Sequence, residues 1–263
     1  MFLHAMDLSN QGFKKICIVS PDSDVVVIAL YAYWALNLDE LWVEFGVGIK
    51  KKWLPIHTYA HALGEPICHA LPFWHAFTGC DTVSQFAGRG KKTAWAAWEV
   101  FPEVTKTFAS IPFSKNLTED DLASLQKFVV LMYSRTCPVF SVNKCRKYLF
   151  TKPPNKAIEN CPPTLDSLIQ HVKRAMLQSL IWMESLFNSA PIDITKYSWT
   201  FGEDGCAFPV WCTLQKASKV CKELVRCGCR LKCTPGKCSC KKNGLGLPCS
   251  DLCLCGGTCY KVG

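Results

Sequence analysis

The chain has 263 residues, of which 49% are hydrophobic, and its formal net charge is +9. This length and composition predict one large domain with an apolar core and room for a small second module. They exclude a membrane-spanning helix, because the longest apolar run, residues 25–36, is too short to cross a bilayer. The excess of positive charge favours polyanionic partners, and we expect a soluble intracellular protein with no membrane partner.

Strands alternate with helices in the first 110 residues, which is typical of an α/β sheet. The elements that we predict there are a strand at 14–20, a helix or an extension of the core at 25–36, strands at 41–45 and 52–56, and helices at 57–63 and 67–77. In α/β sheets ligands bind at the carboxyl ends of the strands. Residues 22–24 are therefore expected at such an edge.

The pattern is helical from Asp81 onward. Thr118 and Thr164 are predicted N-caps, the first for a helix to about Tyr133 and the second for a longer helix with a helical period of apolar residues. We divide the chain into an α/β domain at 1–110, a helical extension at 111–190, an irregular strap at 191–220 and a cysteine-rich tail at 221–263.

Three carboxylates form a candidate catalytic site in the α/β domain: Asp22, Asp24 and Asp81. The first two follow a strand, and the third follows an apolar helix in a Gly-Cys-Asp sequence. Hard cations such as Mg²⁺ and Mn²⁺ bind several oxygen ligands, and two such ions clamp the attacking and leaving oxygens of a phosphodiester. The alternative is a structural role, in which Asp22 or Asp24 caps the following helix.

A glycine-rich basic turn follows Asp81. It comprises Gly88, Arg89, Gly90, Lys91 and Lys92. Backbone N–H groups at a helix N-terminus bind phosphate, and the basic side chains add positive charge. We therefore expect this turn to hold a nucleic-acid backbone.

Residues 16–30, which include PDSDVVVIAL, and residues 73–105, which include HAFTGCDTVSQFAGRGKKTAW, resemble the second half of a flap-endonuclease-like PIN domain. That family carries Asp-x-Asp after a strand, a hydrophobic helix ending in Gly-x-Asp, and a Gly-x-Gly hairpin that grips duplex backbone. The resemblance implies a divalent-metal-dependent nuclease with Mg²⁺ or Mn²⁺ at Asp22, Asp24 and Asp81. The family needs further upstream carboxylates, and Asp7 is the only acid before Asp22. We therefore expect a truncated PIN-like domain that is incomplete as an enzyme.

The last 37 residues hold nine cysteines in paired clusters, and their large aliphatic residues are five Leu and one Val. The nine are Cys227, Cys229, Cys233, Cys238, Cys240, Cys249, Cys253, Cys255 and Cys259. Thiolates at Cys-x-Cys spacing bind zinc, and nine of them fill the coordination of three structural zinc ions if three thiolates bridge. The alternative is a disulfide knot. The odd count argues against it, as do the other cysteines, which are scattered singly as in a reducing compartment.

Basic side chains surround these cysteines. From Cys221 to the end, eight Lys or Arg and two acidic residues give a formal charge of +6, which nine thiolates and three zinc ions reduce to about +3. The side chains that we expect to contact nucleic-acid phosphates are Arg230, Lys232, Lys237, Lys241 and Lys242. The alternative is that they only neutralise the thiolates and keep the tail soluble.

The tail resembles the tesmin/TSO1-type CXC domain, whose relatives bind three zinc ions and contact DNA. That family often has Tyr where this chain has Lys237, and many relatives have two repeats where this chain has one. Together with PPTLDSLIQHVKRA (162–175), the motifs above are similar to a mobile-element-associated family expanded in invertebrate genomes, in which a PIN-like fold precedes such a tail. The resemblance implies a nuclear zinc protein that binds nucleic acid, DNA rather than RNA, and derives from a nuclease. The alternatives are a non-enzymatic chromatin-associated protein or an inactive fragment.

The remaining cysteines and histidines that could act as ligands or nucleophiles show no sequence pattern of a functional site. Cys17, Cys68 and Cys80 stand in apolar sequence and are expected in the core. The histidines lack the intervening Glu of a zincin. We expect structural roles for His57, His61, His69 and His75.

Overall fold

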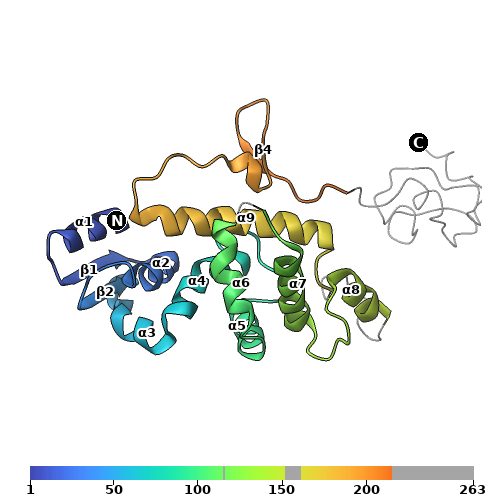
Figure 1. Ribbon diagram of the computed structural model, residues 1–263, viewed down its shortest axis with the longest axis horizontal. Helices are drawn as coiled ribbons and strands as arrows, with labels where there is room; N and C mark the ends of the chain where they lie inside the picture. The colour runs from blue at the N-terminus through green and yellow to red at the C-terminus, as the bar shows by residue number, and fades with distance from the viewer. Residues whose placement is uncertain (115, 152–160, 215–263) are drawn as a thin grey trace, which may run out of the picture. The chain divides into compact units, whose positions relative to one another are not determined.

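The computed structural model describes residues 1–114, 116–151 and 161–214 (Figure 1). The chain divides into two compact units, Met1–Thr213 and Leu214–Gly263. The first unit takes in the sequence regions 1–110 and 111–190 and most of the strap. The cysteine-rich tail lies outside the described residues.

A three-stranded sheet in the first unit confirms the α/β fold class. Its strands are β1 (Lys15–Ser20), β2 (Glu40–Phe45) and β3 (Lys52–Pro55), in the order β1-β2-β3. β1 runs parallel to β2, with Ile18 opposite Val43, and β3 runs antiparallel to β2. Each strand lies within one residue of its predicted bounds.

One face of β1 is buried and the other is open. Ile16 and Ile18 are in the core, whereas Cys17 and Val19 are exposed. The prediction that Cys17 is a core residue is therefore wrong, because a strand places alternate side chains on opposite faces and this sheet is covered on one of them. Cys68, in contrast, is fully buried as predicted.

Helices make up most of the rest of the first unit. They are α1 (Phe2–Asn10), α2 (Ser23–Tyr33), α3 (Ile56–Leu63), α4 (Glu65–Phe77), α5 (Lys91–Val100), α6 (Val104–Ser110), α7 (Glu119–Tyr133), α8 (Val142–Thr151) and α9 (Leu165–Met183). The apolar run at 25–36 thus forms a helix, and α3 and α4 lie where the sequence predicts them. Short 3₁₀ turns stand at Gly48–Lys50, Ile111–Phe113, Glu184–Leu186 and Ile194–Tyr197.

The core is built around α4, whose second half is buried on all sides. A helix that is apolar all round belongs in the interior. Phe73 and Phe77 of α4 stack with ring centroids 5.5 Å apart, and Phe108 of α6 meets Phe128 of α7 edge-on at 5.0 Å. Phe77 also contacts both of these rings. This aromatic cluster joins the α/β domain to the helical extension in one continuous core.

Both predicted N-caps are present. Thr118 accepts the backbone N–H of Asp121 at 3.1 Å, and the Asp121 carboxylate reaches back to the Thr118 amide, which forms a capping box. Thr164 accepts the N–H of Ser167 at 3.3 Å. Within the described ranges, no helix combines the length and apolarity needed to span a membrane.

The strap returns along α9, the long helix that runs across the shorter ones in Figure 1. Ser198 donates to Gln170 at 2.7 Å, and the amide and hydroxyl of Thr213 both donate to Asp166. The strap is less irregular than predicted, since it contains a hairpin of β4 (Trp199–Phe201) and β5 (Ala207–Pro209). A left-handed glycine, Gly205 with φ +75°, lies in its turn.

Candidate functional site

The Asp-x-Asp sequence lies at the carboxyl end of β1, where α2 begins. Asp22 is the N-cap of α2, and its carboxylate accepts the backbone N–H of Asp24 at 2.9 Å. The Asp22 amide in turn donates to the Ser20 hydroxyl at 3.2 Å. The capping alternative is thus what the structure shows for Asp22, and the positive end of the helix dipole favours both carboxylates.

Asp24 turns inward and binds a histidine of α4 for which we predicted a structural role. Its Oδ1 lies 2.8 Å from Nε2 of His75, a residue of α4 that is 9% exposed. Because a carboxylate only accepts, Nε2 carries the hydrogen. The other ring contact of His75 is the indole of Trp182 on α9, with centroids 5.6 Å apart.

Lys91 completes this cluster from the first turn of α5. Its ammonium donates to the backbone carbonyl of His75 and, at 2.8 Å, to the hydroxyl of Thr78. It also lies 5.3 Å from the ring centroid of Trp74. A cation at the carboxyl end of α4 meets the negative end of that helix dipole. We call Asp22, Asp24, His75, Thr78 and Lys91 the Asp–His–Lys cluster.

Burial and mutual charge set the protonation of the cluster. Burial lowers the pKa of Lys91 to about 8, with Cys80 and Asp24 opposing the shift. The pKa of His75 is lowered first by burial and then by the charge of Lys91, while Asp24 and Asp22 act in the opposite sense. At neutral pH the imidazole is therefore uncharged, and its contact with Asp24 is a hydrogen bond to a carboxylate rather than an ion pair.

Asp81 stays apart from the other two carboxylates. It is exposed in the turn after α4, where Gly79 has φ +112° and packs so closely on Gln85 that a side chain would clash. In the part of the chain that the structure describes, no three His, Cys, Asp or Glu side chains come together in a group that could hold a metal ion. Asp22 is engaged as a cap and Asp24 is bound to His75, and an Mg²⁺ or Mn²⁺ site at these carboxylates stays a prediction.

The basic turn divides between the surface and the interior. Gly88, Gly90 and Lys92 are exposed, whereas the Lys91 ammonium is committed to the Asp–His–Lys cluster. The Arg89 guanidinium lies over the ring of Tyr133, 4.8 Å from its centroid. Of the basic side chains predicted to grip phosphate here, Lys92 is thus the one that the structure leaves fully exposed. Gly90 caps α5 without a side chain, so the first amides of α5 have no side-chain partner.

The predicted zinc ligands and the tail's predicted phosphate contacts lie outside the described residues. The cysteines concerned are Cys227, Cys229, Cys233, Cys238, Cys240, Cys249, Cys253, Cys255 and Cys259, and the basic residues are Arg230, Lys232, Lys237, Lys241 and Lys242. Their assignment stays a prediction.

Comparison with protein-family models, curated proteins and solved structures finds no match to this chain. The class that the structure itself defines is a mixed α/β protein with a large helical part. The PIN-like and CXC resemblances therefore stand on the motifs quoted above.

Two further side chains have surroundings that sequence reasoning missed. Arg174 of α9 is 3% exposed, and Arg146 of α8 is half-buried; both border a cavity. Arg174 falls at a buried position of a helix with an apolar stripe. That position could have marked it in the sequence, because arginine is rarely fully buried without a partner.

Proposed function

We propose that the chain is a nucleic-acid-binding protein, with DNA preferred to RNA, whose contacts are made by a tail folded around three structural zinc ions. The observation that carries the proposal is the distribution of charge. Residues 215–263 hold ten of the 30 Lys and Arg but only two of the 21 Asp and Glu, so residues 1–214 have a net charge of only +1. The site of polyanion binding is then the tail, and a nuclear location follows from that partner.

The first unit serves, in this proposal, as a folded body that carries the tail. The polar side chains of its Asp–His–Lys cluster are engaged in hydrogen bonds within the protein, and its basic turn directs Lys91 inward. Both features support binding without turnover. They also agree with descent from a metal-dependent, PIN-like nuclease that is incomplete as an enzyme.

The experiment that tests the proposal compares two triple variants of equal charge change. Lys237, Lys241 and Lys242 changed to Gln should weaken duplex DNA binding by about tenfold or more and flatten its salt dependence, because each phosphate contact releases counterions. The matched control changes Lys50, Lys52 and Lys106, which are exposed on the first unit, to Gln. Fluorescence anisotropy at several salt concentrations provides both quantities. Equal losses in the two triple variants would contradict the proposal, as would tighter binding to RNA of the same sequence.

Metal-dependent cleavage is the second candidate function, favoured by the position of Asp22 and Asp24 at the carboxyl end of β1. Our proposal predicts that the purified chain does not cut labelled DNA in Mn²⁺. It also predicts that Asp22→Asn combined with Asp24→Asn leaves DNA binding unchanged. Cleavage that disappears in this double variant would overturn the non-enzymatic proposal and restore the carboxylate site.

A further inference from the structure

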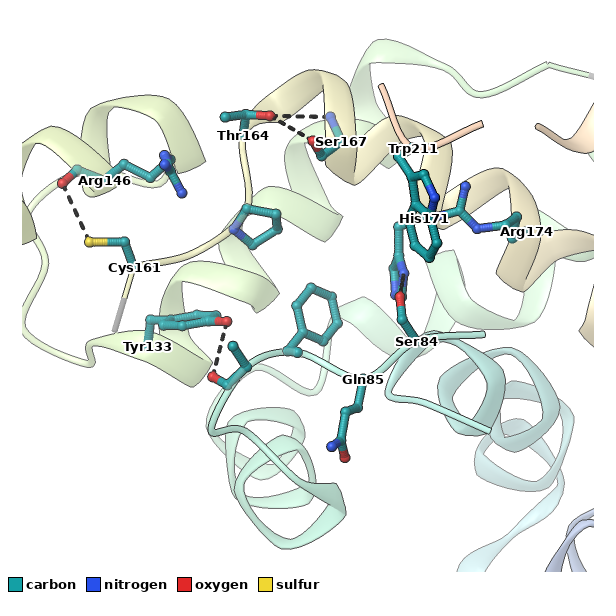
Figure 2. A pocket seen from close by; sticks show the side chains of 13 residues that line it. Ser84, Gln85, Tyr133, Arg146, Cys161, Thr164, Ser167, His171, Arg174 and Trp211 are labelled. Atoms are coloured by element: carbon teal, nitrogen blue, oxygen red, sulfur yellow. Dashed lines mark hydrogen bonds between the residues drawn. The ribbon is translucent and has the colours of Figure 1, made fainter. Parts of the chain in front are cut away.

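A cavity of about 470 Å³ lies between α7, α8, α9 and the end of the strap, and none of its lining residues belongs to the Asp–His–Lys cluster (Figure 2). Its size is that of a small-ligand site. Its polar lining residues include Ser84, Arg146, Ser167 and Arg174, and its apolar ones include Phe86 and Trp211. Of the described residues that line it, none is Asp or Glu.

The two arginines give the cavity its charge. In Figure 2, Arg146 lies on one side and Arg174 with Trp211 on the other. Arg146 donates to the carbonyl of Pro162, and Arg174 donates to the carbonyl of Val210 at 2.6 Å. Among the described residues, neither guanidinium has a carboxylate within ion-pair distance. A buried cation without a counter-ion is costly, so the cavity favours an anion.

The N-terminus of α9 adds to this field. Thr164 and Ser167, the cap and the third residue of a 19-residue helix, both border the cavity. The positive end of a helix dipole favours anions. Asp166, in the same turn, accepts from Thr213 of the strap and does not line the cavity.

The lining also offers a platform for a planar ring. Trp211 is 60% exposed, and its indole is covered on one side by the Arg174 guanidinium, 5.0 Å from the ring centroid. An exposed indole can stack on a nucleic-acid base. Phe86 adds a buried apolar wall. His171 contributes no charge at neutral pH: its Nε2–H donates to the carbonyl of Phe77 at 2.7 Å, and burial holds its pKa at about 4.

We propose that this cavity binds a nucleoside monophosphate unit, with the phosphate between Arg146, Arg174 and the N-terminus of α9 and the base against Trp211. The planar guanidinium of arginine binds phosphate oxygens in a bidentate manner. A free nucleotide and the phosphorylated end of a nucleic-acid strand share this chemistry. The site is built from residues of the first unit, and the inference does not rest on the function proposed for the tail.

The test uses a substitution that is compatible with the N-terminus of α9 but should repel an anionic ligand. Ser167 stands three residues after the N-cap Thr164, so Ser167→Glu and Ser167→Gln both complete a capping box and leave α9 intact. Only Glu brings a negative charge to the arginines. Titration calorimetry of the full zinc-loaded chain with adenosine 5′-monophosphate should give a measurable dissociation constant for Ser167→Gln, which serves as the uncharged reference. For Ser167→Glu it should be weaker by about tenfold or more, the scale of one lost charge-assisted contact.

Two further probes identify the parts of the ligand and its source. Inorganic phosphate and adenosine, each alone, should bind more weakly than the monophosphate. Oligothymidylates with and without a 5′-phosphate then separate the two sources. A preference for the phosphorylated strand that Ser167→Glu removes identifies the strand end as the ligand. Tight binding of the monophosphate without such a preference identifies the free nucleotide. No binding of either phosphate-bearing probe, or equal binding by the Glu and Gln variants, would overturn the proposal. Equal affinity for inorganic phosphate and for the monophosphate would also overturn it. The triple Lys variant of the tail should retain monophosphate binding, so this inference and the proposed DNA-binding function fail separately.

Discussion

At the scale of single residues, the informative feature is how the Asp–His–Lys cluster satisfies its polar groups with hydrogen bonds. Asp24 accepts from His75, and the Lys91 ammonium binds the carbonyl of that same histidine. Each buried polar group therefore has a partner, which avoids the penalty of an unpaired charge in the interior. The two side chains that complete the cluster stand 51 and 67 residues after Asp24.

Removing the charge of Lys91 should raise the pKa of His75. Lys91→Met keeps the length of the side chain and its contact with Trp74 but removes the cation that opposes protonation of the imidazole. An NMR titration of the His75 ring protons measures this directly. The shift should be upward relative to the unchanged chain.

Asp24→Asn provides the opposite test in the same titration. The amide oxygen still accepts from Nε2, but the charge that favours the imidazolium is gone, so the pKa of His75 should fall further. Shifts of the same sign in the two variants would contradict the geometry of the cluster.

At the scale of elements, neighbouring residues determine where a helix begins and ends, but they do not determine which other helix it packs against. α7 begins after Thr118 and ends at Tyr133 because a capping box and an apolar period are both written in neighbouring residues. The junction of α4 and α9 depends instead on His171, whose ring stands 5.2 Å from that of Phe77 and whose Nε2 binds the carbonyl of that residue. The sequence around either residue does not reveal this contact.

This junction predicts a loss of stability in acid. The folded pKa of His171, about 4, lies below its ordinary value of 6.5, so the unfolded chain binds the proton more tightly. The contribution is fully present above about pH 6.5 and is lost as pH falls toward 4, by about 3 kcal/mol in total.

Urea unfolding at pH 7 and pH 4.5 measures the effect. His171→Asn keeps a donor on the side chain but has no titrating ring, so its free energy of unfolding should change less with pH than that of the unchanged chain. A variant with the same acid dependence as the unchanged chain would refute this account of the junction.

At the scale of the whole molecule, the chain separates an apolar body from a charged tail. The core of the body runs from Phe2 to Leu186 within the first compact unit. The tail holds nine cysteines in its last 37 residues and carries most of the net charge, but it has no Ile, Met, Phe or Trp. Zinc is thus expected to supply the folding energy of the tail, and burial of apolar surface that of the body.

Removal of zinc should therefore abolish DNA binding and leave the body folded. All nine tryptophans precede Leu214, so tryptophan fluorescence reports on the first unit alone. After treatment with a chelator under reducing conditions, the urea midpoint from fluorescence should be unchanged while anisotropy shows no DNA binding. Elemental mass spectrometry should find about three zinc ions per untreated chain, as nine thiolates with bridging require. A large shift of the fluorescence midpoint, or DNA binding that survives zinc removal, would contradict this division.

The sequence by itself determined the strands β1 to β3, the helices α2, α3, α4, α7 and α9, and the caps of the last two, because alternation, helical period and capping residues act over a few positions. It also placed Asp22 at the end of β1, with capping as one of two stated roles. Tertiary structure alone decided that Cys17 faces outward, that Asp24 binds His75, that Lys91 turns inward and that Asp81 stands apart. It alone brought Arg146, Arg174 and Trp211 around one cavity. These outcomes depend on which faces of the sheet and helices are covered by segments distant in sequence, and no local pattern encodes that.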